Sequence, residues 1–473
     1  ATENYLRHIS DTNQTNPLPN LGASFASTRA SGRSIGTPGA VKMLELIHQD
    51  HGQKAWDTLF DPAIQLATNG FGISGRMADA IAGAKNDLLR DPDAAAYFLN
   101  ADSSPKALGT IIKNPEYAQT LGSIAKGGAN AFYTGPIAQS IVNKIKVTSS
   151  GGANPVAITP GLTELSDLAN YKAIKREPVC TTYRNYWVCG MGPPSSGGIA
   201  VAQSLGILEN FDLAALKVDG VDSQHLQIEA MKLAFADVYR FVAEESAMEV
   251  TAAQMLDPAY LKNRAQLINM KKAQNFGAGN PVKGGTIYLS AADENGMMVS
   301  FIQSNYMGFG SGCVEPTFGV SLQNRGHAFN VSANGHNPAN LVAPGKRPFH
   351  TIIPAFLTKD GQPVMSYGVM GANMQPQGHM QTLVRMLDYG QNPQAACDAP
   401  RWRYNEGLVI NVESAMDPHT VKGLQALGHQ MEVIKDSYQD CGSGQFIWRT
   451  GDPKVQGYVA ASDSRRDGLV AGF

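Results

Sequence analysis

The stretch Gly284-Gly-Thr-Ile-Tyr-Leu-Ser-Ala-Ala-Asp-Glu-Asn-Gly296 decides the fold that the sequence predicts. It follows a Gly- and Pro-rich segment, residues 275–285, which has little to pack. Residues 286–292 predict a strand, residues 293–296 predict a tight turn, and residues 297–304 predict the returning strand. The sequence therefore predicts a β-hairpin that begins at a threonine directly after two glycines.

The Gly285–Thr286 bond is a candidate site of self-cleavage. In an enzyme with an N-terminal nucleophile, cleavage makes a hydroxyl residue the new N-terminus, and its free α-amine, with a pKa near neutrality, acts as the base for that hydroxyl. A glycine before Thr286 lets the backbone adopt the strained geometry that attack on the preceding carbonyl requires. The same residues are common at ordinary strand starts, so spacing alone leaves Thr286 open between a nucleophile and a plain strand residue.

The composition indicates a compact enzyme with an ample core. Of the 473 residues, 43% are apolar and 16% are charged, and the charged share lies below the roughly 25% of an average soluble domain. The formal net charge is -2 and no basic run occurs. This balance excludes an electrostatically driven binder of nucleic acid or of a membrane surface. No stretch approaches the about 20 apolar residues of a membrane helix.

Helical spacing dominates the first part of the chain, and strands alternate with helices after residue 275. The clearest helix is predicted over residues 222–241, whose apolar side chains fall on one stripe. This order of elements predicts an α+β layered fold and not a regular βαβ repeat. Further elements are expected as follows: helices at 56–67, 107–125, 137–146, 381–389 and 417–427, and strands at 364–368, 408–412 and 457–462.

Motifs for metals and cofactors are absent from the sequence. The ten histidines are scattered, and there is no HExxH, phosphate-binding loop or dinucleotide fingerprint. We therefore expect neither a metal nor an organic cofactor. Gly32-Arg-Ser-Ile-Gly36 matches the string of a hydrolase nucleophile elbow, but polar residues precede it where that elbow needs a buried strand.

The five cysteines form no even-numbered framework. Cys180 and Cys189 flank a strand-rich stretch and have a spacing that permits pairing, but two reduced thiols are the expectation, which favours a reducing compartment. We expect a cytoplasmic protein, because residues 1–19 show no signal peptide. A periplasmic or secreted protein is the alternative, if a signal peptide was lost with an earlier segment. Cys313 has no basic neighbour and is expected to be a buried, inert thiol.

Eight stretches spread along the chain form a recognisable set: Gly36–Gly39, Trp56–Phe71, Gly192–Phe211, Ala234–Asp237, Phe309–Gly312, Lys346–Pro348, Asp398–Arg401 and Ala461–Phe473. The Pro193-Pro-Ser-Ser-Gly-Gly198 string and the last stretch are the most specific. Together they resemble the gamma-glutamyltransferase (gamma-glutamyltranspeptidase) family of N-terminal-nucleophile (Ntn) hydrolases, essentially from end to end. Within this pattern Ser195 and Ser196 are expected to be structural, since two prolines and two glycines surround them.

The resemblance implies a four-layer αββα Ntn-hydrolase sandwich. It implies one precursor that is cut into a large subunit, residues 1–285, and a small subunit, residues 286–473. A homodimer of such processed heterodimers is one quaternary arrangement open to the chain. The resemblance also implies catalytic roles: nucleophile for Thr286, second hydroxyl for Ser304, and oxyanion hole for the backbone N–H groups of Gly371 and Ala372.

The residues that hold the acyl donor depart from the family's pattern. Tyr306 stands where the family has an Asn, and Arg325 and Ala328 stand where a Gln and an Asp complete the grip on the donor's α-amine. His350 and Thr351 replace two serines that hold its α-carboxylate. An acidic site for an ammonium group has thus become neutral or basic, which suits an acyl group that ends only in a carboxylate, such as glutaryl.

Three functions stay open at this point. The first is a gamma-glutamyltransferase or hydrolase for glutathione-like donors, whose acyl-enzyme is released by water or an amino acceptor. The second is a glutaryl-type amidase, as in the family's cephalosporin-acylase-like branch, although those acylases typically begin their small subunit with Ser. The third is an unprocessed, catalytically silent homologue that binds its ligand. Structural roles also stay open for Tyr306, Arg325 and His350, and the family's donor-binding Arg belongs to a segment upstream of Ala1.

Overall fold

The computed structural model describes residues 31–149, 160–276, 286–330, 337–435 and 441–473. The chain forms two compact units. Unit 1 comprises Ala1–Lys175, Asn305–Ala333 and Leu341–Lys346, and unit 2 comprises Arg176–Ser304, Asn334–Asn340 and Arg347–Phe473. Each unit contains residues from both sides of Thr286, so the division into residues 1–285 and 286–473 stays a prediction about a covalent cut. Residues 1–19 and most of the predicted linker, residues 277–285, lie outside the described residues.

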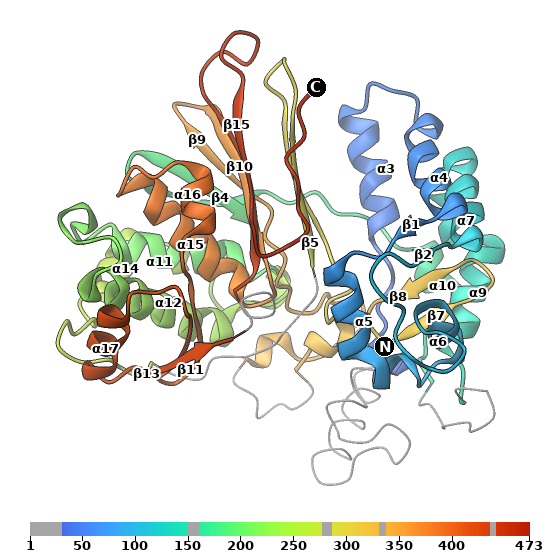
Figure 1. Ribbon diagram of the computed structural model, residues 1–473, viewed down its shortest axis with the longest axis horizontal. Helices are drawn as coiled ribbons and strands as arrows, with labels where there is room; N and C mark the ends of the chain where they lie inside the picture. The colour runs from blue at the N-terminus through green and yellow to red at the C-terminus, as the bar shows by residue number, and fades with distance from the viewer. Residues whose placement is uncertain (1–30, 150–159, 277–285, 331–336, 436–440) are drawn as a thin grey trace. The chain divides into compact units, whose positions relative to one another are not determined.

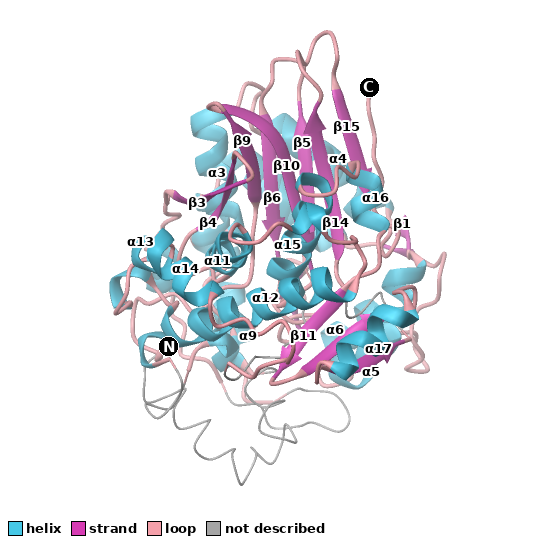
Figure 2. Ribbon diagram, turned by 90° about the vertical axis from the view of Figure 1, so that its left-hand side faces the viewer, coloured by secondary structure: helices cyan, strands magenta, loops and turns pink. Residues whose placement is uncertain are grey.

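A six-stranded antiparallel sheet forms the centre of unit 2 (Figures 1 and 2). Its order is β15-β14-β10-β9-β4-β3. Two-residue turns with positive φ at both positions, Arg184-Asn185 and Asp360-Gly361, join β3 to β4 and β9 to β10, as the twist of a tight hairpin requires. The strands are β3 (Pro178–Tyr183), β4 (Tyr186–Met191), β9 (Ala355–Lys359), β10 (Gln362–Met370), β14 (Ser443–Arg449) and β15 (Tyr458–Ser462).

Two long helices, α11 (Gly197–Leu208) and α15 (Met374–Leu387), cover one face of this sheet, and a third, α12 (Val221–Phe241), packs on α11 (Figure 1). The helix predicted over residues 222–241 is confirmed. The helix predicted from residue 381 begins seven residues earlier, at Met374. The prediction missed its first turns because they lack an apolar stripe. Buried Gln377 and Gln381 instead donate hydrogen bonds to the carbonyls of Tyr404 and Trp402, at 3.1 and 2.9 Å.

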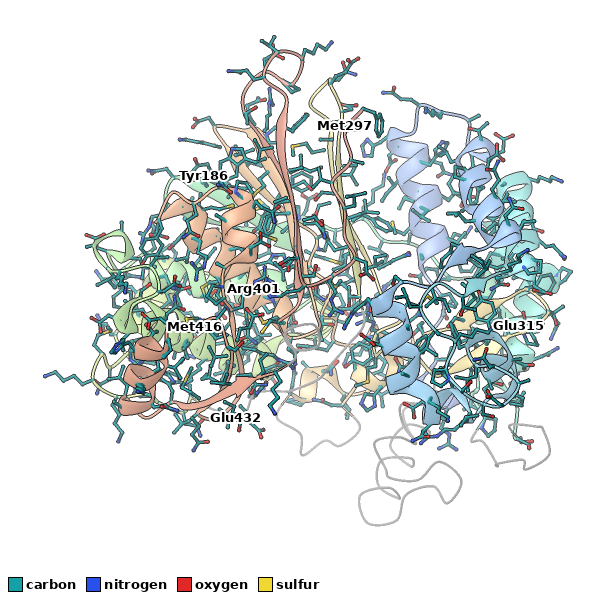
Figure 3. All side chains as sticks on the ribbon, in the orientation of Figure 1. Tyr186, Met297, Glu315, Arg401, Met416 and Glu432 are labelled. Atoms are coloured by element: carbon teal, nitrogen blue, oxygen red, sulfur yellow. A yellow bond between two sulfur atoms is a disulfide. The ribbon has the colours of Figure 1, made fainter. Side chains whose placement is uncertain are left out.

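The predicted hairpin is also confirmed, as β5 (Ile287–Ala292) and β6 (Met298–Gln303). It packs on the face of the sheet that lies opposite α11 and α15 (Figures 1 and 2). Met297 lies at the tip of the hairpin (Figure 3), and Gly296 in the turn has a φ of 88°, a conformation that glycine adopts without strain. This part of unit 2 therefore has three layers: the helices, the six-stranded sheet and the smaller β5–β6 sheet.

The remaining elements of unit 2 complete its helical side. A three-stranded sheet of β11, β12 and β13 has one antiparallel and one parallel pair. The elements are α13 (Ala252–Met255), α14 (Pro258–Ala265), α16 (Pro393–Asp398), β11 (Trp402–Glu406), β12 (Val409–Glu413), α17 (Pro418–Ala426) and β13 (Gln430–Ile434). The strands predicted at 408–412 and 457–462 and the helix predicted at 417–427 are confirmed within about one residue.

Unit 1 is mainly helical. Its hairpin of β7 and β8 is fastened to helices by side chains: Ser140 Oγ donates to Glu315 Oε1 at 2.6 Å, and Thr120 Oγ1 donates to the Phe318 carbonyl at 2.8 Å. The elements are α3 (Ala40–His51), α4 (Asp61–Asn69), β1 (Phe71–Gly72), α5 (Gly75–Leu88), α6 (Pro92–Phe98), β2 (Ile111–Ile112), α7 (Pro115–Gly127), α8 (Asn130–Tyr133), α9 (Gly135–Ile145), α10 (Leu165–Ala169), β7 (Cys313–Glu315) and β8 (Val320–Leu322).

The helix predicted over residues 107–125 is wrong at its start. Residues 111–112 form a short strand, and the helix begins only at Pro115, with the Asn114 side chain accepting a hydrogen bond from the Tyr117 N–H as its N-cap. None of the helices in the described ranges is long and apolar enough to cross a membrane.

Cys180 and Cys189 form a disulfide, so the prediction of two reduced thiols is wrong. The two residues are direct partners in the register of β3 and β4, with 4.1 Å between their Cα atoms. The tight Arg184-Asn185 turn creates this register, which the cysteine spacing alone did not fix. Cys313 is buried as expected, and burial raises the pKa of its thiol to about 11.

Candidate active site

Thr286 and Ser304 face each other at the open end of the β5–β6 hairpin. The register pairs Ile287 with Gln303, so the next step along the ladder brings Thr286 opposite Ser304. The Oγ1 of Thr286 donates a hydrogen bond to the Oγ of Ser304 at 3.2 Å. Side chains alternate along a strand, so Thr286 shares the face of Tyr288, which is buried against the six-stranded sheet.

The predicted oxyanion turn, Gly371-Ala372, joins the end of β10 to the start of α15. Both residues have positive φ, 129° for Gly371 and 52° for Ala372. A Cβ added to Gly371 would lie 2.9 Å from the Cα of Gly442, so the turn has no room for a side chain there. A non-glycine residue in the left-handed region costs on the order of 1 kcal/mol, and such strain concentrates at functional sites.

The turn presents two backbone N–H groups that have no partner among the described residues. The carbonyls of Gly371 and Ala372 accept hydrogen bonds from the N–H groups of Met374 and Gln375, both at 3.0 Å. Within the described part of the chain, the N–H groups of Gly371 and Ala372 themselves donate to no acceptor. They lie just before the N-terminus of α15, where the helix dipole adds positive potential. Two adjacent unmet donors at this position are suited to hold an anionic oxygen.

His350 and Thr351 lie in a segment that Ser195 and Ser196 fix. Both the N–H and the Oγ of Ser196 donate to the carbonyl of His350 at 2.9 Å. The Oγ of Ser195 donates to the carbonyl of Ile352 at 2.5 Å. These buried serines bond backbone carbonyls, which agrees with the structural role expected of them. Thr351 is itself buried.

Tyr306 and Arg325 lie together in unit 1. The guanidinium carbon of Arg325 is 4.6 Å from the centroid of the Tyr306 ring, within the range of a cation–π contact. Both residues are buried, and Tyr306 has a positive φ of 78°. Burial lowers the pKa of Arg325 to about 10, so its guanidinium remains charged at neutral pH. The Arg325 charge also opposes the rise that burial causes in the pKa of Tyr306.

The eight predicted site residues thus fall into two groups. Unit 2 contains Thr286 and Ser304 on the hairpin, Gly371 and Ala372 in the turn, and His350 and Thr351 before β9. Unit 1 contains the stacked pair of Tyr306 and Arg325. Ala328, at a position where the resemblance implies an acidic residue, ends the short 3₁₀ turn that Arg325 begins. The catalytic and binding roles of all eight residues stay predictions.

The sequence did not predict a buried cluster of titratable residues on α12 and next to β13. His225, Glu229 and His429 lie close enough for their ligand atoms to share a metal ion, the one such group within the described residues. However, the Nζ of Lys232 donates to Glu229 at 2.8 Å and lies 3.3 Å from Nδ1 of His429. This ammonium already balances the carboxylate, so we assign no metal to the cluster. The i, i+4 and i+7 spacing of residues 225, 229 and 232 was its only sequence signal.

The fold has a solved counterpart. The crystal structure of cephalosporin acylase from Bacillus halodurans matches 96% of this chain and 80% of that chain, with a TM-score of 0.83 and 34% sequence identity. The chain therefore has the αββα Ntn-hydrolase fold that the resemblance implied. It is an enzyme of the Ntn amidohydrolase and acyltransferase class.

Sequence comparison identifies the family. The sequence model of the gamma-glutamyltranspeptidase family matches residues 13–473. The glutathione hydrolase-like YwrD proenzyme of Bacillus subtilis (strain 168) is 31% identical, over 96% of this chain and 83% of its own length. The acylase ACY 1 proenzyme of Pseudomonas sp. (strain V22) is 32% identical, over 92% and 77%. The chain belongs to the gamma-glutamyltranspeptidase family.

Proposed function

We propose that the chain is a gamma-glutamyltransferase-like amide hydrolase and acyltransferase that cleaves itself at Gly285–Thr286. The observation that carries this proposal is the position of Thr286 at the head of the hairpin, with its hydroxyl bonded to Ser304. Cleavage there gives Thr286 a free α-amine beside its own hydroxyl. The proenzyme names of the two relatives also support cleavage. Gly285 lies outside the described residues.

The chemistry needs one side chain and the backbone. The Oγ1 of Thr286 attacks the carbonyl carbon of the substrate amide while the α-amine takes the hydroxyl proton. The C–N bond then breaks, the same proton passes to the leaving amine, and an ester joins the acyl group to Thr286. Water attacks this ester, with the α-amine again taking and returning the proton, and the acid is released. An amino acceptor in place of water gives transfer.

The Gly371-Ala372 turn stabilises the charge that develops in this reaction. Attack turns the carbonyl oxygen into an oxyanion in both steps. The two N–H groups that lack a partner within the described residues supply donors to it, and the hydrogen bonds from the N–H groups of Met374 and Gln375 to the carbonyls of the turn hold the turn in place before substrate binds. Preorganised donors of this kind contribute on the order of 10²–10³-fold to a rate.

A second candidate concerns the acyl group. The buried, charged guanidinium of Arg325 on Tyr306 favours a terminal carboxylate, and Ala328 offers no carboxylate for a donor's ammonium group. This observation favours a glutaryl-type amidase, and the solved protein with the same fold is called a cephalosporin acylase. The residues at these predicted donor positions thus favour a simple dicarboxylic acyl group, whereas the threonine at position 286 is closer to the pattern of the transferases.

Turnover of two chromogenic amides separates these candidates. Gamma-glutamyl and glutaryl p-nitroanilides differ only in the α-amine, so the ratio of their kcat/KM values reports on that group alone. We expect the glutaryl compound to be preferred, because the charge of Arg325 repels the α-ammonium group of the gamma-glutamyl compound, and we expect Arg325→Gln to reduce this preference. A strong preference for the gamma-glutamyl compound would contradict the role of Arg325 and favour a gamma-glutamyltransferase over a glutaryl-type amidase. A wild-type chain that stays uncut and inactive would instead support the silent homologue.

The disulfide bears on where the protein works. Disulfides persist in oxidising compartments, and Cys180 and Cys189 are joined. We therefore propose a periplasmic or secreted protein, the alternative to the cytoplasmic one.

The two subunits cut from one precursor form the functional heterodimer in this proposal. Sedimentation of the processed protein tests for a homodimer of such heterodimers.

A further inference from the structure

Four hydroxyl side chains meet in the layer between the hairpin and the six-stranded sheet. The hydroxyl of Tyr288 on β5 lies 2.8 Å from the Oγ of Ser290 and 2.7 Å from the Oγ of Ser300 on β6. Ser290 Oγ lies 3.0 Å from the Oγ of Ser366 on β10. Burial raises the pKa of Tyr288, so the phenol stays protonated at neutral pH and donates one bond while it accepts another.

Backbone groups tie this hydroxyl cluster to both sheets. The N–H of Ala355, the first residue of β9, donates to Ser300 Oγ at 2.9 Å. Ser366 Oγ also lies 2.8 Å from the carbonyl of Val299 on β6, as donor to it. The cluster therefore links the hairpin to β9 and to β10 by directional hydrogen bonds. Apolar packing alone would permit the hairpin to slide along the six-stranded sheet.

The ring of Tyr288 fixes the hairpin at a second point. Gly368 of β10 lies directly under it, and a Cβ added to Gly368 would be 2.4 Å from Cε2 of the ring. Tyr288 lies two residues after Thr286, on the same face of the strand, and Gly368 lies three residues before Gly371. This contact therefore joins the strand that carries Thr286 to the strand that leads into the Gly371-Ala372 turn.

A neighbouring tyrosine allows the contribution of the Tyr288 hydroxyl to be distinguished from that of its ring. Tyr367, next to Gly368 on β10, is fully buried, yet its hydroxyl has no hydrogen-bond partner among the residues that the structure describes. A buried tyrosine in this core thus does not need its hydroxyl in order to pack. The two tyrosines form a matched pair that differs in whether the hydroxyl links the two sheets.

We infer that Tyr288 is a positioning residue, which through Ser300 and Gly368 holds Thr286 in line with the Gly371-Ala372 turn. The inference rests on the proposed roles of Thr286 and of the turn. Nucleophilic attack depends on the distance and angle between the attacking oxygen and the carbonyl that the turn polarises, and a misplacement of about 1 Å costs on the order of 10²-fold in rate. Neither Tyr288 nor the serines touch the reacting atoms.

The test compares Tyr288→Phe with Tyr367→Phe in the full-length chain. Both changes remove one buried hydroxyl oxygen and keep the ring. Tyr288→Phe should lower kcat for the better of the two p-nitroanilides by about tenfold or more with little change in KM, and it should slow the appearance of the two cleavage fragments. Tyr367→Phe should keep the wild-type kcat, KM and cleavage rate. Ser300→Ala, which leaves the Tyr288 ring intact, should reproduce the loss in kcat.

A purely structural role gives another pattern. If Tyr288→Phe and Ser300→Ala lower the melting temperature but leave kcat and the cleavage rate at the wild-type values, the positioning role is wrong. Thr286→Ala, measured alongside, keeps the two proposals apart. If it is uncut and inactive, such a result overturns the positioning role alone; if it retains activity, the proposed function fails first.

Discussion

The hydroxyl of Thr286 lies 3.2 Å from the hydroxyl of Ser304 across the open end of the β5–β6 hairpin. The register of the hairpin produces this pair, because Ile287 and Gln303 are the last partners inside the ladder. A β-branched threonine has restricted χ1 rotamers, whereas serine at position 304 offers the same oxygen with fewer constraints. The geometry thus calls for a hydroxyl at residue 304, and not for a particular side chain.

The pair predicts a difference between two substitutions of Ser304. Ser304→Thr keeps the oxygen and should retain most of the activity, whereas Ser304→Ala removes the acceptor for Thr286 Oγ1 and should lower kcat by about 10–100-fold. Steady-state kinetics on processed protein checks this. Equal activity of the two variants would show that the hydroxyl of Ser304 has no part in the reaction.

The Gly371-Ala372 turn predicts opposite results at two adjacent residues. Gly371→Ala should lower kcat by about 10²-fold, because the new Cβ meets the Cα of Gly442 at 2.9 Å and the turn must move. Ala372→Gly should retain activity and raise stability by up to about 1 kcal/mol, since the positive φ of 52° suits glycine. Kinetics and thermal melts of both variants measure the two effects. Wild-type kcat in Gly371→Ala would argue against an oxyanion hole at this turn.

The disulfide predicts a thiol count. In denaturant without a reductant, three of the five cysteines should react with a thiol reagent, and all five should react after reduction. Replacing Cys180 and Cys189 together by alanine should reduce stability by about 2–3 kcal/mol, as closure of so short a loop implies. Five reactive thiols before reduction would restore the expectation of reduced cysteines.

The buried histidine cluster predicts an acid-sensitive fold. Burial, with the charge of Lys232 and the neighbouring His225, lowers the pKa of His429 to about 2, against about 6.5 in the unfolded chain. Below pH 6.5 the unfolded state therefore binds a proton at His429 that the folded state does not. Stability should fall as the pH drops from about 6.5, by about 1.4 kcal/mol per pH unit from this residue.

Melting temperatures between pH 7.5 and pH 5 test this with a matched pair. His429→Gln should make the loss of stability on acidification less steep. His419→Gln, which makes the same change at an exposed position on α17, should leave the slope unchanged. Equal slopes in both variants would contradict a role for His429 in the acid response.

The sequence predicted those parts of the fold that local patterns control. The hairpin after residue 285 has alternation and a turn residue at Gly296, and the helix at 222–241 has a clear apolar stripe. The start of α15 was missed because buried glutamines, Gln377 and Gln381, replace apolar residues there. Their hydrogen bonds to β11 form only in the tertiary structure. The periodicity of the sequence therefore does not predict them.

The candidate site divides in the same way. Motifs that resemble a family predict its residues. The contacts between these residues and their neighbours are seen only in the structure. The stacking of Arg325 on Tyr306 joins residues 19 positions apart, and the bonds from Tyr288 to Ser300 and from Ser290 to Ser366 depend on how the sheets pack. The disulfide depends on register, which spacing alone left open. Such long-range relationships need coordinates.

Intact-mass measurement of the purified protein, together with activity, tests the central claim that Thr286 is both the cleavage site and the nucleophile. The wild-type chain should yield two fragments, the smaller beginning with Thr286 at its N-terminus, and should hydrolyse at least one of the two p-nitroanilides. The Thr286→Ala chain should stay whole and inactive. A Thr286→Ala chain that is cut at the same bond and active, or a wild-type chain that is active without being cut, would contradict the account.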